Sequence, residues 1–221
     1  MITPRLSVAI AMAFCTAPAF AQAPANDDCT GAIPATVGIN PTDSTAATDG
    51  SGLALNPAVC NMGPFGDEQI YADVWFTFTP ASTSTYSFIQ DDLGNPAFDG
   101  RIALYDQSTC PDDPANVIAC NDDQGAGNVQ AGMFDVPLTG GSTYLLRFGS
   151  YGPFTAEQLA GVVIETPPAN DDCANATVAM TGSNLFNAAA ASTDGQSLDP
   201  LVCSLGFGND DIFQDVWFEF T

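Results

Sequence analysis

A short stretch in the middle of the chain concentrates side chains that could bind a cation. Asn121, Asp122 and Asp123 are followed by Gln124 and a glycine, so oxygen-bearing side chains are adjacent in a turn-forming segment. Ca²⁺ takes about six to eight oxygen ligands, which clustered aspartate and asparagine side chains and backbone carbonyls supply. Asp99, which precedes an alternating segment, is expected at the same end of the fold. The candidate calcium ligands are Asp99, Asn121, Asp122 and Asp123. The alternative is that these are turn residues with solvated carboxylates.

The residue inventory argues against catalysis. The chain has no histidine and no lysine, so it has no Ser-His-Asp triad, no histidine-bearing zinc site and no Schiff-base lysine. Paired carboxylates of the glycosidase type are the chemistry that remains. Because aspartate is so abundant here, such pairs arise by chance. We therefore expect a protein that is not an enzyme.

The charge of the chain excludes whole classes of partner. It carries 26 acidic residues against three basic ones, a formal net charge of −23. Nucleic acids and anionic membranes are bound through Lys and Arg, so neither is an expected partner. Solubility outside the cell is the simplest role for such a charge. Divalent cations are its natural counter-charges.

Residues 1–21 have the pattern of a cleaved signal peptide. Arg5 supplies the positive charge, residues 6–14 form an apolar run, and Ala19-Phe20-Ala21 is a small-x-small cleavage site. The apolar run is too short for a membrane span of about 20 residues. No later stretch is long and apolar enough, so no membrane span is expected. We predict a protein that is secreted or held at the cell surface.

A repeat organises the rest of the chain. Residues 24–29 recur as residues 168–173, and the Asp-Val-Trp-Phe pattern around Trp75 recurs around Trp217. The copies are 144 residues apart at Cys29 and Cys173, which is an ordinary length for one domain. We predict a complete module at residues 26–166, a Pro-rich linker at 167–169 and the N-terminal part of a second, truncated module at 170–221. The chain is expected to be a fragment of a longer protein.

The cysteines indicate disulfides. Six of the seven cysteines lie beyond the predicted signal, and an even number in an exported protein indicates disulfide bonds rather than metal ligands or nucleophiles. Each copy of the repeat contains two cysteines near its start, which favours a disulfide within each copy. The favoured pairs are Cys29–Cys60, Cys110–Cys120 and Cys173–Cys203.

Alternation of apolar and polar residues predicts strands. In residues 71–79, Val74, Phe76 and Phe78 lie on one side and Trp75 on the other, the pattern of a half-buried strand. Trp75 either stacks on a sugar in solvent or covers the core, and its recurrence as Trp217 favours packing. Further strands are predicted at residues 84–90, 99–106, 117–120, 133–138, 143–148 and 161–164.

Short strands separated by turn residues indicate an all-β protein. Seven to nine strands at roughly ten-residue spacing are typical of an antiparallel β-sandwich. Gly140 and Gly141 lie between two alternating runs and predict a β-hairpin there.

Several motifs follow one another in a distinctive order: Asn-Asp-Asp-Cys ending at Cys29, Asp-Val-Trp-Phe-x-Phe from Asp73, and residues 98–105, 119–123 and 141–148. This order resembles a known family, the prepeptidase C-terminal-type (PPC-like) modules of large secreted bacterial proteins. The resemblance covers about residues 26–166 and the truncated second module. It implies a jelly-roll-like sandwich with an accessory or adhesive role, associated in some relatives with calcium or polymer binding. The region from Cys29 to Cys60 departs from the shorter relatives.

These observations predict a non-catalytic extracellular binding or adhesion protein, with calcium as its one candidate cofactor. Its expected partner is an unidentified extracellular polymer, polysaccharide or protein, or neighbouring modules. One alternative is an accessory region of a secreted hydrolase whose catalytic domain lies beyond the end of this chain. Another is a structural stalk of stacked modules.

Overall fold

A computed structural model describes most of the chain beyond the predicted signal, which itself lies outside the described residues. The described residues are 22–49, 53–60, 68–91, 93, 98–124, 127–153, 159–188, 190–192, 195, 212 and 214–220. Within them the chain forms strands and three 3₁₀ turns, η1 (Cys29–Gly31), η2 (Pro114–Asn116) and η3 (Cys173–Asn175). No helix in this part of the chain is long and apolar enough to cross a membrane.

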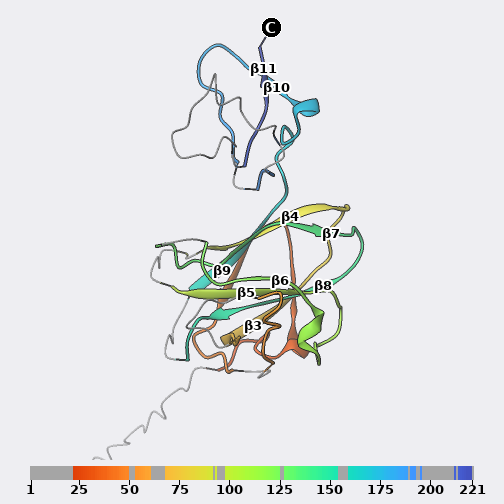
Figure 1. Cartoon of the computed structure of the whole chain (residues 1–221). Helices are drawn as coiled ribbons and strands as arrows, with labels where there is room; N and C mark the ends of the chain where they lie inside the picture. The colour runs from red at the N-terminus through yellow and green to blue at the C-terminus, as the bar shows by residue number, and fades with distance from the viewer. Residues whose placement is uncertain are drawn as a thin grey trace, which may run out of the picture.

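Two sheets pack face to face in the larger part of the molecule (Figure 1). Except for the parallel pair β1–β3, neighbouring strands are antiparallel. The predicted all-β, jelly-roll-like antiparallel sandwich is confirmed. One sheet has the order β1 (Ile33–Ala35), β3 (Tyr71–Phe78), β8 (Tyr144–Ser150), β5 (Gly100–Tyr105), β6 (Val117–Asn121). The other has the order β2 (Gly38–Asp43), β9 (Leu159–Glu165), β4 (Ser84–Asp91), β7 (Gly132–Leu138).

The main core lies between the sheets and uses the predicted inner face of β3. Val74, Phe76 and Phe78 are buried there. The Phe78 ring meets the rings of Tyr86 and Phe88 on β4 edge to face, at centroid distances of 5.4 and 5.7 Å. Such aromatic pairs add stability beyond the area they bury, so β3 and β4 are tied together across the sandwich.

The outer face of β3 is buried as well, so the expectation of a half-buried strand is wrong. Trp75 is fully buried in a second cluster with Leu55, Cys60 and Tyr105. Residues 53–60 supply Leu55 and Cys60, and they cover what would otherwise be the solvent face of this sheet. The packing role of Trp75 is confirmed, and it has no surface to offer a sugar.

The disulfides connect the covering segments to β6 and to the segment that follows β5, not to each other. The bonds are Cys29–Cys110 and Cys60–Cys120, so the expected pairs Cys29–Cys60 and Cys110–Cys120 are wrong. The reason is the second cluster: each early cysteine lies over the outer face, next to a cysteine that follows β5 or lies on β6. Cys173 is exposed and has no disulfide partner among the described residues, and its expected partner Cys203 lies outside them.

The glycine pair Gly140-Gly141 does not form the predicted hairpin. The strands on either side, β7 and β8, belong to different sheets, so the turn carries the chain across the sandwich. Gly141 has φ +79° and donates its N–H to the Pro80 carbonyl at 2.8 Å. A side chain at Gly140 would meet the backbone of Ser82. The glycines thus allow two turns to approach each other closely. They do not connect two hydrogen-bonded neighbouring strands.

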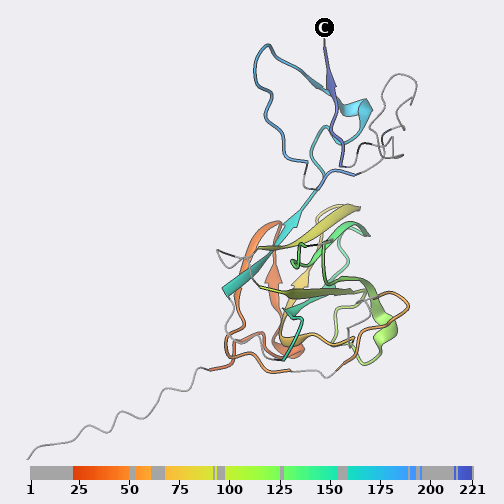
Figure 2. The same cartoon turned by 60° about the vertical axis from the view of Figure 1, so that its left-hand side comes forward.

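The described part of residues 168–220, which we call the second copy, repeats contacts of the first copy's opening segment. The Asn26 amide donates to the Trp75 carbonyl at 3.0 Å, and the Asn170 amide donates to the Trp217 carbonyl at the same distance. Strands β10 (Thr177–Val178) and β11 (Phe218–Glu219) pair in parallel as β1 and β3 do. Figures 1 and 2 show this part beyond the end of β9, apart from the sandwich.

Candidate functional site

Three acidic side chains meet where β5 begins and β6 ends. The two strands are antiparallel neighbours, with Ile102 opposite Asn121, so the residue before β5 lies beside the residues after β6. One carboxylate oxygen from each of Asp99, Asp122 and Asp123 lies within 4.8 Å of the others. The structure therefore brings together three of the four predicted calcium ligands.

The fourth predicted ligand, Asn121, is engaged elsewhere. Its side-chain oxygen accepts a hydrogen bond from the Gly132 N–H at 3.2 Å. Gly132 is the first residue of β7, so this bond links the end of β6 to the opposite sheet. The role that the structure gives Asn121 is to connect the end of β6 with the start of β7.

A buried arginine, which the sequence interpretation missed, supports the acidic cluster. Arg101 is fully buried, and it donates to Asp122 Oδ2 at 3.3 Å and to the Gln69 carbonyl at 2.5 Å. Its guanidinium carbon lies 4.5 Å from the centre of the Tyr151 ring. Arg101 lies two residues after Asp99, and it is one of only two basic residues beyond the predicted signal. The scarcity of basic residues was the sequence signal that could have identified Arg101.

The electrostatics of the cluster leave part of its negative charge uncompensated. Burial, followed by the charges of Asp122 and Asp123, raises the pKa of Asp99 to about 6, and Arg101 opposes this shift. Burial also raises the pKa of Asp122, against its hydrogen bond with Arg101. One guanidinium thus offsets three carboxylates only in part. A divalent cation would remove the remaining repulsion.

A second buried charge pair lies on the outer face of the same sheet and was also missed. Arg147 on β8 is fully buried, and its Nε donates to Asp73 Oδ2 at 2.9 Å. It also donates to the carbonyls of Leu53 and Ile70 at 2.8 and 3.0 Å. With no access to solvent, this pair holds the segment around Leu53 over Trp75 and is structural.

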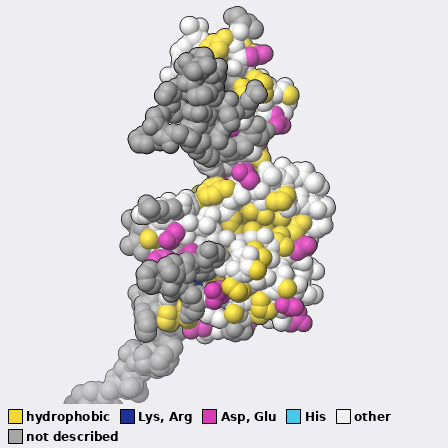
Figure 3. Space-filling model, in the orientation of Figure 1, with side chains coloured by type: hydrophobic (Ala, Val, Ile, Leu, Met, Phe, Trp, Pro, Cys, Tyr) yellow, Lys and Arg dark blue, Asp and Glu magenta, His cyan; other side chains and the backbone are white. Residues whose placement is uncertain are grey.

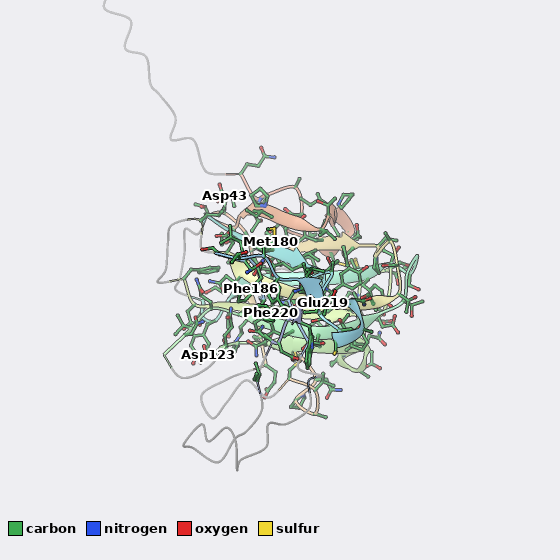
Figure 4. All side chains as sticks on the ribbon, turned by 90° about the horizontal axis from the view of Figure 1, so that it is seen from above. Asp43, Asp123, Met180, Phe186, Glu219 and Phe220 are labelled. Atoms are coloured by element: carbon green, nitrogen blue, oxygen red, sulfur yellow. A yellow bond between two sulfur atoms is a disulfide. The ribbon has the colours of Figure 1, made fainter. Side chains whose placement is uncertain are left out.

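The two arginines leave the described surface without positive side chains. Both Arg101 and Arg147 are fully buried, so the charged side chains exposed in the described part of the chain are acidic. Figure 3 shows acidic side chains scattered over both parts of the molecule. Asp123, the exposed member of the cluster, lies at the rim of the sandwich in the view from above (Figure 4).

Comparison with protein families identifies a module over most of this sandwich. Residues 25–159 match a family model described as galactose binding domain-like, whose name associates it with T9SS, the type IX secretion system. No curated protein matches the chain. The family match agrees with the β-sandwich expected from the sequence, while the prepeptidase C-terminal-type resemblance stays a prediction.

Proposed function

This chain belongs to the galactose-binding-domain-like family associated with T9SS, and we propose that it is an extracellular adhesion protein that binds a polysaccharide or protein polymer through a calcium-bearing end of its sandwich. Modules of this kind bind carbohydrate or protein. The family association and the two disulfides both point to an extracellular protein. Its action is binding, without catalysis.

The observation that carries the proposal is the cluster of Asp99, Asp122 and Asp123. Three carboxylates within 4.8 Å supply hard oxygen ligands, and backbone carbonyls, water or ligand hydroxyls complete the coordination that Ca²⁺ requires. Tyr151 lies at the same end, where its N–H donates to the Asp99 carbonyl at 3.0 Å. A half-buried aromatic ring beside a cation site suits a hydroxyl-rich polymer.

Glycan-array binding of the full chain, in Ca²⁺ and in EDTA, tests the proposal. We expect binding to an acidic or neutral polysaccharide that EDTA removes and that Asp99→Asn weakens. Asp106→Asn is the matched control, because Asp106 is exposed and follows the other end of the same strand. Binding that is unchanged by EDTA and by Asp99→Asn would place the ligand site elsewhere.

Two alternative functions are compatible with the same fold. A stalk of stacked modules is supported by the recurrence of the Asn26–Trp75 contact as Asn170–Trp217. An accessory role in a secreted hydrolase requires a catalytic domain on the same polypeptide. The sequence of the complete gene separates the two: further Asp-Val-Trp-Phe repeats favour a stalk or adhesin, and a catalytic motif favours the hydrolase.

A further inference from the structure

The two disulfides differ in how accessible they are to a reagent in solvent. Cys110 is exposed and Cys29 is half-buried, whereas Cys60 is 1% exposed and Cys120 is half-buried beneath the cluster around Trp75. Thiol–disulfide exchange begins when a thiolate attacks one sulfur of the bond, so it requires access to that sulfur. Exposed disulfides are the labile ones for this reason. Of the two bonds, only Cys29–Cys110 has an exposed cysteine.

A hollow in the surface leads to the Cys29–Cys110 bond. Its volume is about 550 Å³, and both cysteines form part of its wall. This volume is within the range of about 300–1,000 Å³ that accommodates small molecules. The other residues of the wall carry a hydroxyl group or are apolar, and none is charged: Thr30, Ala32, Thr77, Ser108, Thr109 and Leu145. A small thiol compound therefore has room to lie against the bond.

The residues on either side of this bond are negatively charged. Asp28 precedes Cys29, and Asp112 lies two residues after Cys110; both aspartates are exposed. Two residues span at most about 7 Å, which is shorter than the screening length of about 8 Å at physiological salt. Within the described part of the chain no exposed basic side chain offsets these charges, because both arginines are buried in ion pairs. The local charge attracts a cationic thiol and repels an anionic one.

We propose that Cys29–Cys110 is an exchange site for small thiol compounds that carry a positive charge, and that Cys60–Cys120 is a permanent link. The thiolate of the compound attacks Sγ of Cys110 and forms a mixed disulfide there. The bond to Cys29 breaks, and the Cys29 sulfur leaves with the bonding electrons and takes a proton from water. A second thiol molecule attacks the compound's sulfur in the mixed disulfide, which leaves Cys110 as a thiol and releases the compound as its own disulfide. The two thiol molecules supply the two electrons that reduce the bond.

The exchange loosens the opening segment of the module and leaves the sandwich intact. Cys29 belongs to η1, which the bond fastens to the segment after β5. The Asn26 amide donates to the Trp75 carbonyl at 3.0 Å, and the Trp75 N–H donates to the Asn26 carbonyl at 2.8 Å; neither bond involves a cysteine. Cys60–Cys120 meanwhile keeps residues 53–60 over Trp75. The protein can thus carry a thiol compound on its surface while it stays folded.

Limited reduction of the full chain with dithiothreitol, followed by alkylation and peptide mass mapping, tests which bond opens. We expect Cys29 and Cys110 to be alkylated at least about tenfold faster than Cys60 and Cys120, because the attacked sulfur is accessible. Tryptophan fluorescence should not change during this first step, since Trp75 stays covered. Equal rates for the two bonds, faster opening of Cys60–Cys120, or no opening of Cys29–Cys110 before the chain unfolds overturns the proposal.

Cysteamine and 3-mercaptopropionate, two thiols of similar size and opposite charge, test the preference for a positive charge. The ratio of their rates at Cys29–Cys110 should fall about threefold or more between 0.01 M and 1 M salt, where the screening length shortens from about 30 to about 3 Å. Asp112→Asn should lower the ratio at low salt. Glu219→Gln is the control, because Glu219 is exposed on β11 and the charge change is the same. A ratio that does not depend on salt, or that falls equally in both variants, overturns the proposal.

Discussion

Arg147 lies directly opposite Trp75 in the β3–β8 ladder, with its guanidinium carbon 5.3 Å from the centre of the Trp75 ring. The same guanidinium bonds to Asp73 two residues earlier on β3. One buried cation therefore links the indole, a carboxylate and the covering segment around Leu53. This arrangement explains how an acidic chain keeps an aromatic side chain buried on the outer face of a sheet.

Replacing Arg147 by methionine should destabilise the sandwich strongly. The change leaves the fully buried Asp73 carboxylate without its cation, and breaking such a pair costs about 3–5 kcal/mol. Chemical denaturation measures the loss. The double variant Asp73→Asn, Arg147→Met should recover part of it, because no uncompensated charge remains. A single variant within about 1 kcal/mol of the parent would mean that the pair does not hold the segment in place.

Peptide mapping without reduction should recover the Cys29–Cys110 and Cys60–Cys120 links. Removing the second by Cys60→Ser, Cys120→Ser opens a loop with a sequence separation of 60 and should cost about 2–4 kcal/mol of unfolding free energy. Residues 53–60 should then cover Trp75 less tightly, and its fluorescence should shift to the red. Recovery of a Cys29–Cys60 peptide would contradict the structure.

In EDTA, Asp99 should make stability fall as pH rises. Its pKa in the folded protein is about 6, above the ordinary 3.8, so between these values the folded state binds more protons than the unfolded state. Its contribution is most favourable below about pH 4 and is lost through pH 6. The groups facing it are Asp122, Asp123 and Arg101.

Asp99→Asn isolates this effect in denaturation curves at pH 4 and pH 7. The variant and the parent should be similar in stability at pH 4, where both side chains are neutral. At pH 7 the variant should be the more stable, since the parent then carries a charge that its surroundings disfavour. A stability difference that does not change with pH would show that the pKa of Asp99 is not raised.

Period-two alternation predicted β3 to β9 because it reports directly on the inner face of each sheet, as Val74, Phe76 and Phe78 show. It did not predict β1 and β2. It could not predict the burial of Trp75, since that depends on residues 53–60 folding back over the outer face. The predicted cysteine pairs were wrong for a similar reason. An internal repeat shows which residues of the two copies correspond to each other, but it does not show which cysteines lie close together in space.

The candidate site was likewise predicted from the sequence only in part. Aspartate-rich turns marked Asp122 and Asp123, and the pairing of β5 with β6 explains why Asp99 joins them. The hydrogen bond from Gly132 to Asn121 depends on the opposite sheet, which local sequence does not specify. The Asp73–Arg147 pair joins residues far apart in the chain, and only the fold places them together.

Calorimetric titration of the full chain with Ca²⁺, with the melting temperature measured in parallel, tests the central claim most directly. We predict saturable heat at about one site, together with a higher melting temperature in excess Ca²⁺ because the ion binds the folded state. Asp99→Asn should abolish both, and Asp106→Asn should leave both intact. No heat and an unchanged melting temperature for the parent chain would contradict the proposal that this end of the sandwich binds calcium.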